Sequence, residues 1–152
     1  MIIDIGLGEP IDVAVAGTLR LFFHIRRREV GEDGGLTLEL CTPCDTADGG
    51  EQELLRFDLF RDDPHYHVPA SDPKPVAIPV RGSLEALDFA TGLLAREFDA
   101  LLERAGHADL AALARTLDIG PALTALGEAG RRAPEPTRFE KFEVTPQMLG
   151  RE

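Results

Sequence analysis

The chain has 152 residues, of which 43% are hydrophobic and 28% are charged, so it has the length and composition of one ordinary globular domain. Its net charge of −11 argues against nucleic-acid binding, because phosphate backbones are held by clustered Lys and Arg. No apolar run approaches the roughly 20 residues of a membrane span, and the first residues lack the basic region of a signal peptide. We therefore expect a cytoplasmic protein that is not bound to a membrane.

Alternation of apolar and polar residues predicts strands through the first 80 residues. In the clearest strand Leu21, Phe23 and Ile25 share one face. Pro75 and Pro79 each remove a ladder donor, so the last strand belongs at an edge. Turn signals between successive runs indicate an antiparallel meander. The strands are expected at 11–16, 18–28, 36–42, 53–61 and 76–80.

Three- and four-residue spacing of apolar residues predicts helices from residue 83 onward. Ser83 is the expected N-cap of a helix about 20 residues long that carries Phe98 on its apolar stripe and stops at Gly106. Asp109 is expected to cap a second helix and Pro121 to open a third. Strands followed by helices are typical of an α+β fold. We expect a sheet of four or five strands, covered on one face by two or three C-terminal helices.

The expected domain covers residues 1–132, with strands in 11–80 and helices in 83–130, followed by an extended proline-containing tail at 133–152. Phe22 and Phe60 project from the sheet face opposite the helices, and Leu54 shares that side. Such a patch, with the apolar residues of the tail, predicts a homodimer in which both contribute. A monomer whose tail docks on its own sheet is the alternative, and a protein partner is a further possibility.

The densest group of functional side chains lies in residues 55–67, where His65 and His67 project to one side of an extended chain and Tyr66 to the other. Two such imidazoles can bind one divalent metal ion with a third ligand, or act as general acid and base. A structural role, in which the histidines cap a turn, is the alternative. The candidate further ligands are Asp58, Asp62 and His24.

Other polar residues give weaker signals. Arg20, Arg56 and Tyr66 form a candidate polar patch, for which cross-strand ion pairs on a solvated face are an equally simple explanation. The pair Cys41 and Cys44 follows a strand instead of preceding a helix, so the usual redox mechanism is missing. A mixed zinc site of these cysteines with His65 and His67 matches no familiar zinc module, and we expect a small apolar pair at a strand end. No nucleotide-binding motif is present, so a divalent metal is the one cofactor considered.

The stretch 55–67, Leu-Arg-Phe-Asp-Leu-Phe-Arg-Asp-Asp-Pro-His-Tyr-His, resembles small uncharacterised bacterial proteins with an Arg-Phe-Asp strand and an Asp-Pro-His-Tyr-His turn. The order of strands, histidine segment, Ser-Leu-Glu helix start and long helix is also loosely similar to the TumE family of toxin–antitoxin proteins. That family carries a denser histidine run and an adjacent lysine, whereas this chain has only His65 and His67 there. The resemblance implies a bacterial protein and transfers no toxin activity.

Two functions follow from these observations. The leading hypothesis is a small acidic binding or interaction protein without catalytic activity. The alternative is a small metal- or histidine-dependent enzyme, hydrolase-like or nuclease-like, centred on His65 and His67.

Overall fold

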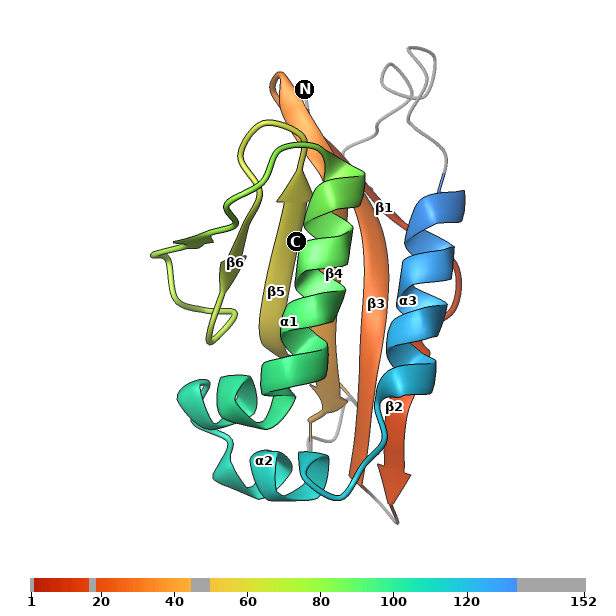
Figure 1. The fold of residues 1–152 in the computed structure, drawn as a ribbon, viewed down its shortest axis with the longest axis vertical. Helices are drawn as coiled ribbons and strands as arrows, with labels where there is room; N and C mark the ends of the chain where they lie inside the picture. The colour runs from red at the N-terminus through yellow and green to blue at the C-terminus, as the bar shows by residue number, and fades with distance from the viewer. Residues whose placement is uncertain (1, 17–18, 45–49, 134–152) are drawn as a thin grey trace.

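A computed structural model describes residues 2–16, 19–44 and 50–133. Its strands are β1 (Ile2–Gly6), β2 (Ile11–Ala16), β3 (Leu19–Val30), β4 (Asp33–Pro43), β5 (Glu51–Phe60), β6 (His65–His67) and β7 (Val76–Ala77). Its helices are α1 (Ser83–Arg104), α2 (Ala108–Ala114) and α3 (Gly120–Arg132). The strands form one antiparallel sheet and the helices follow them in the chain (Figure 1), which confirms the predicted α+β layout.

Within the described residues the sheet has seven strands, more than the four or five expected. Strands β3 to β7 form the predicted meander, while β1 and β2 both pair with β3. Strand β1 pairs with the C-terminal half of β3 and β2 with its N-terminal half, so together they make one edge strand interrupted at 7–10. The five residues of β1 are too short a run for alternation to identify, and only their pairing with β3 makes them a strand.

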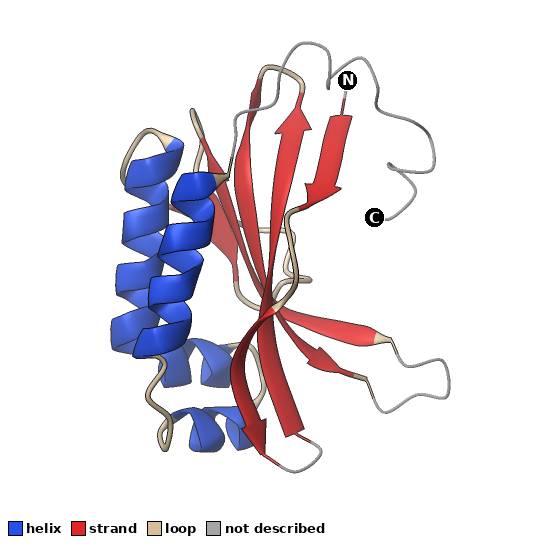
Figure 2. Ribbon diagram, turned by 90° about the vertical axis from the view of Figure 1, so that its right-hand side faces the viewer, coloured by secondary structure: helices blue, strands red, loops and turns tan. Residues whose placement is uncertain are grey.

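The helices cover one face of the sheet, as Figure 2 shows from the side. Helix α1 packs against β5, and α3 against β2. The predicted apolar stripe of α1 is buried against this face: Leu87 and Leu94 are fully buried and Phe98 is 5% exposed. The helix bends at Glu97, whose φ of −131° is not helical, a feature that the apolar periodicity did not reveal.

The helix starts differ in part from those predicted. Helix α1 begins at Ser83 itself, whose hydroxyl donates to the carbonyl oxygen of Leu59 at 2.9 Å instead of capping the helix. The preceding Gly82 has a φ of +95°. Asp109 lies inside the first turn of α2 and does not cap it; in that turn the positive end of the helix dipole stabilises its carboxylate. Pro121 opens α3, as predicted.

The apolar patch expected on the outer sheet face, away from the helices, is not exposed. Phe22 is 1% exposed: the guanidinium carbon of Arg20 lies 4.5 Å from its ring centroid, and the His24 ring packs against it at nearly a right angle, with centroids 5.2 Å apart. Phe60 is 9% exposed and meets the edge of His65 with ring centroids 5.7 Å apart. Neighbouring polar side chains of the same chain therefore cover both rings, and the homodimer prediction loses this support.

Leu54 does not lie on the outer face either. The register pairs Leu40 with Leu55 but Cys41 with Glu53, so Leu54 is an extra residue, a β-bulge in β5. Leu54 and Leu55 are both fully buried in the core. The bulge also reverses the alternation beyond it, which turns Glu53 and Glu51 toward the outer face.

The predicted tail at 133–152 lies outside the described residues except for Ala133, so its position and the homodimer remain predictions. None of the three helices in the described part of the chain has the length and apolar character needed to span a membrane.

Candidate functional site

The outer face of the sheet carries a polar cluster held in rows by strand register. Each row takes one side chain from β3, β4, β5 and β6 in turn, because these strands pair with their neighbours without interruption here. Residues two apart on a strand share a face, so both rows point away from the helices. The rows are Arg26, Thr37, Asp58 and His65, and His24, Glu39, Arg56 and His67.

Asp58 is the centre of this cluster and is 2% exposed. Thr37 Oγ1 donates to its Oδ1 at 2.9 Å, and Arg56 Nε donates to its Oδ2 at 3.3 Å. Burial by itself raises the pKa of Asp58, but the hydrogen bond from His65, the charge of Arg56 and the Thr37 hydroxyl together hold that pKa below its ordinary value. Asp58 is therefore a buried, ionised carboxylate.

The two histidines of β6 share the outer face, as their His-x-His spacing predicted, and on this face both lie against Asp58. Their Nε2 atoms lie 3.2 Å (His65) and 3.7 Å (His67) from Asp58 Oδ2. Each Nδ1 contacts a backbone carbonyl oxygen, of Asp63 at 2.8 Å for His65 and of Asp72 at 2.7 Å for His67. A carbonyl oxygen only accepts hydrogen bonds, so both Nδ1 atoms carry the proton. Metal-binding histidines are held in this way, with Nδ1–H donated outward and Nε2 left for the ion.

The hydrogen bond with Asp58 raises the pKa of His65, and this effect outweighs the lowering caused by burial. The raised pKa favours the charged form of His65, in which a proton on Nε2 lies between the ring and Asp58. A metal cation suits the same position, because a metal ion, like the protonated His65 ring, would balance the negative charge of the buried Asp58 carboxylate.

A polar pocket of about 320 Å³ lies beside Asp58 on the same face. Arg26 Nε donates to Asp4 Oδ1 at 2.7 Å, and Arg56 Nη1 lies 3.6 Å from Glu53 Oε1. Burial and a hydrogen bond with Glu39 raise the pKa of Glu53 to about 8, so the Glu53 carboxyl is mostly protonated at neutral pH. The lining residues are Asp4, Arg26, Arg28, Thr37, Glu39, Glu53 and Arg56.

Two of the predicted ligands do not contact Asp58. Asp62 is exposed beyond the end of β5, and its backbone N–H donates to Asp33 Oδ1 at 3.0 Å. His24 lies farther along the outer face, where its Nε2 is 2.7 Å from Glu51 Oε2. Sequence alone could not place Asp62, which lies in a turn, or His24, whose strand β3 is two strands from the β5 strand of Asp58.

The predicted polar patch of Arg20, Arg56 and Tyr66 does not exist as one surface. Arg56 belongs to the Asp58 cluster, whereas Arg20 pairs with Asp12 at 2.8 Å near the other end of β3. Tyr66 is 8% exposed and lies in the core, stacked on Phe57 with ring centroids 5.2 Å apart. This position follows from the alternation in His65–His67, which turns the middle residue inward.

Several residues of the site were not recognised in the sequence. Thr37 and Glu39 alternate with the buried leucines of β4, and Arg28 shares a face with His24, so alternation contains the signal for all three. Asp4 carries no such signal, because its strand was not predicted. Its carboxylate is 5% exposed between Arg26 and Arg28.

The cysteines were expected to be a small apolar pair at a strand end, but Cys41 also lies beside polar side chains. Both are free thiols, and Cys41 is buried on β4. Among the described residues Cys41 groups with His24 and Glu51, while His65 and His67 group with Asp58. The mixed site of both cysteines with the β6 histidines is therefore not formed.

A family model described as a domain of unknown function, DUF7700, matches residues 13–129. This match spans most of the chain, from β2 to α3, so the chain belongs to that family. Searches among curated proteins and among solved structures find no match.

Proposed function

We propose that this member of the DUF7700 family is a metal-binding protein in which Asp58, His65 and His67 hold one divalent transition-metal ion. The observation that supports this proposal is that both Nε2 atoms face Asp58 Oδ2 while each Nδ1 is bonded to a backbone carbonyl. Two imidazoles and one carboxylate are donors suited to zinc, iron(II) or manganese(II).

The spacing of these atoms also fits an ion. A tetrahedral metal bound at about 2.0–2.1 Å to nitrogen and oxygen keeps its ligand atoms roughly 3.3 Å apart. The two Nε2 to Oδ2 distances are 3.2 and 3.7 Å, so small side-chain movements would accommodate the ion. Arg56 also contacts this oxygen, but it lies 3.6 Å from Glu53 as well and can remain paired there.

Hydrolysis is a second candidate function. Three protein ligands leave a coordination position for water, which is the pattern of catalytic zinc sites as opposed to closed structural ones. Arg28 and Arg56 contact Asp58 and also line the adjacent pocket, where guanidinium groups suit an anionic substrate. A bound metal would supply an acidified water, and the chain's own residues would orient the substrate.

A cytoplasmic location is part of this proposal. It is supported by the two free thiols, which are typical of a reducing compartment.

Isothermal titration with zinc or manganese, on protein prepared without a histidine tag, tests the metal site. A variant carrying His65→Asn and His67→Asn should bind one ion fewer per chain, because both nitrogen ligands are gone. Its far-UV circular dichroism and melting temperature without metal serve as the folding check. His107→Asn, at the start of α2, is the matched control and should bind as the native chain does.

Equal stoichiometry and affinity in the native chain and the double variant would exclude the proposed site. For the hydrolase candidate, a chromogenic phosphate ester should be cleaved only when metal is present, and the double variant should have lost that cleavage. Metal binding without any turnover would leave a binding protein, as the leading sequence hypothesis had it.

A further inference from the structure

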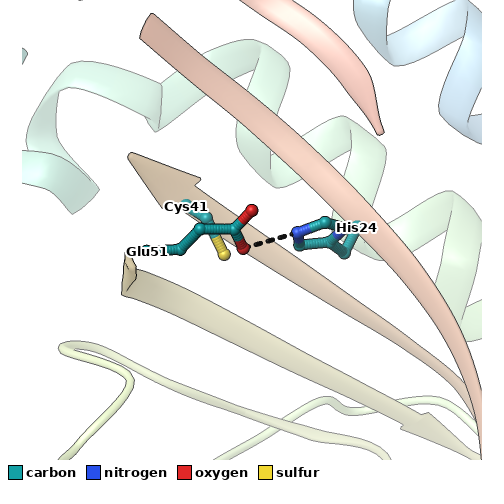
Figure 3. A group of neighbouring side chains, drawn as sticks. All are labelled: His24, Cys41 and Glu51. Atoms are coloured by element: carbon teal, nitrogen blue, oxygen red, sulfur yellow. Dashed lines mark hydrogen bonds and ion pairs between the residues drawn. The ribbon is translucent and has the colours of Figure 1, made fainter. Parts of the chain in front are cut away.

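A second group of metal-ligating side chains lies on the same face of the sheet. His24 of β3, Cys41 of β4 and Glu51 of β5 converge, and Figure 3 shows the Cys41 sulfur on the same side of the His24 ring as the Glu51 carboxylate. His24 Nε2 lies 2.7 Å from Glu51 Oε2. The ligand atoms of all three residues lie within 4.8 Å of one another.

Two irregularities of the sheet create this group. The β-bulge at Leu54 turns Glu51 and Glu53 to the outer face, beside Cys41. The interruption of the edge strand at 7–10 opens a pocket of about 470 Å³ over His24 and Cys41. Gly8 lines that pocket with a φ of +79°, a conformation that side-chain-bearing residues rarely adopt.

The charges around the group favour a cation. The carboxyl groups of Glu39, Glu51 and Glu53 line the pocket, and Arg26, the one arginine among its described lining residues, donates to Asp4 and lies 3.5 Å from Glu39 Oε1. Burial and then the charges of these glutamates raise the pKa of the Cys41 thiol, so the free thiol stays protonated at neutral pH. The Glu51 carboxylate, which disfavours a thiolate while no ion is bound, attracts a divalent ion, and an ion deprotonates a thiol that it binds.

We propose that His24, Cys41 and Glu51 form a zinc-binding site whose remaining coordination position faces the pocket. Imidazole nitrogen, thiolate sulfur and carboxylate oxygen are the three donor types that zinc takes in proteins. On coordination the thiol proton leaves to solvent and the sulfur becomes the third ligand. This site does not depend on Asp58, His65 or His67, which form a separate cluster.

A nucleophilic role for Cys41 fits the geometry less well. In a catalytic triad the histidine lies between nucleophile and carboxylate and contacts each through a different nitrogen. Here the carboxylate contacts Nε2 and the sulfur lies on that same side of the ring. The protonated, buried thiol also lacks the depressed pKa of reactive cysteines.

Titration of the full chain with cobalt(II) chloride tests the inference, because cobalt(II) bound to a thiolate absorbs in the near ultraviolet and cobalt(II) bound to imidazole or carboxylate alone lacks that band. The native chain should develop the band, and an equivalent of zinc should abolish it by displacement. Cys41→Ser should lose the band. The variant carrying His65→Asn and His67→Asn should keep it, which separates this site from the Asp58 site.

Two further variants keep the outcome interpretable if Cys41→Ser folds poorly. Cys44→Ser is the matched cysteine control and should keep the band. His24→Asn leaves the sulfur in place but removes one ligand, and should weaken cobalt binding at least tenfold. Absence of the band from the native chain, or its persistence at full affinity in Cys41→Ser or His24→Asn, would overturn the proposed site.

Discussion

At the scale of single residues, the outer face shows how a buried carboxylate remains ionised. Asp58 is 2% exposed, and its carboxylate accepts hydrogen bonds from Thr37 and Arg56 and contacts the His65 ring. A buried charge without such partners would cost several kcal/mol, so these contacts are a condition of the site. Truncating one donor would leave the carboxylate underpaired, whereas a metal ion can replace the proton of His65.

Glu53 shows the opposite behaviour, because burial and the hydrogen bond with Glu39 raise its pKa from 4.5 to about 8. Between these two values the unfolded chain ionises this carboxyl while the folded chain keeps it protonated. Stability of the metal-free protein therefore falls as pH rises from about 4.5 to about 8. Glu53→Gln mimics the protonated form, and should raise the melting temperature at about pH 8 while changing it little at about pH 5.

Thermal melts in the presence of a chelator measure this difference. Glu32→Gln, an exposed glutamate in the turn after β3, is the control and should show no pH-dependent gain. An equal shift of Glu53→Gln at both pH values would mean that the carboxyl is not protonated in the folded state.

At the scale of elements, alternation correctly predicted which face most residues occupy. The leucines of β4 and Phe57 of β5 are buried under the helices, and His65 and His67 share the outer face. The prediction failed at Leu54, since one extra residue in a strand reverses every assignment beyond it. In the sequence, the bulged residue Leu54 and its neighbour Leu55 look like any two adjacent apolar residues, so the alternation does not reveal the bulge.

The packing of α1 on the sheet can be tested at Phe98, which follows the bend at Glu97 and is 5% exposed. Phe98→Ala should lower the free energy of unfolding by about 3–5 kcal/mol, because it removes a buried ring and leaves a cavity. Leu84→Ala on the same helix, at a position that is 52% exposed, should cost less than about 0.5 kcal/mol. A loss under roughly 1 kcal/mol for Phe98→Ala in a denaturant melt would contradict the packing of this stripe against the sheet.

At the scale of the whole molecule, the two faces of the sheet differ, because the helices lie on one of them (Figure 2). In the described part of the chain, helices α1 and α3 pack on one face of the sheet and α2 packs on α1, while the other face is a polar surface whose aromatic rings are shielded by Arg20, His24 and His65. Both ligand clusters lie on this polar face. A face that combines pockets with paired charges is suited to small polar ligands or ions more than to an apolar partner.

The homodimer remains a prediction that now depends on the tail alone. Light scattering of the full chain should give about twice 16.5 kDa at micromolar concentration, and a chain ending at Ala133 should give the monomer mass. A monomer mass for the full chain would exclude the dimer. A dimer that survives truncation would exclude only the contribution of the tail.

The sequence by itself determined the order of the longer strands and of the helices, the face that most of their residues occupy, and a set of five candidate ligands that includes Asp58, His65 and His67. These features depend on local periodicity, and Asp58, His65 and His67 needed only one short turn to meet. The tertiary structure decided the position of Leu54, the break between β1 and β2, and the meeting of His24, Cys41 and Glu51. Periodicity predicts the face to which a side chain points. Its neighbour across the sheet depends on strand register, and register is set by pairing between segments that are far apart in the sequence.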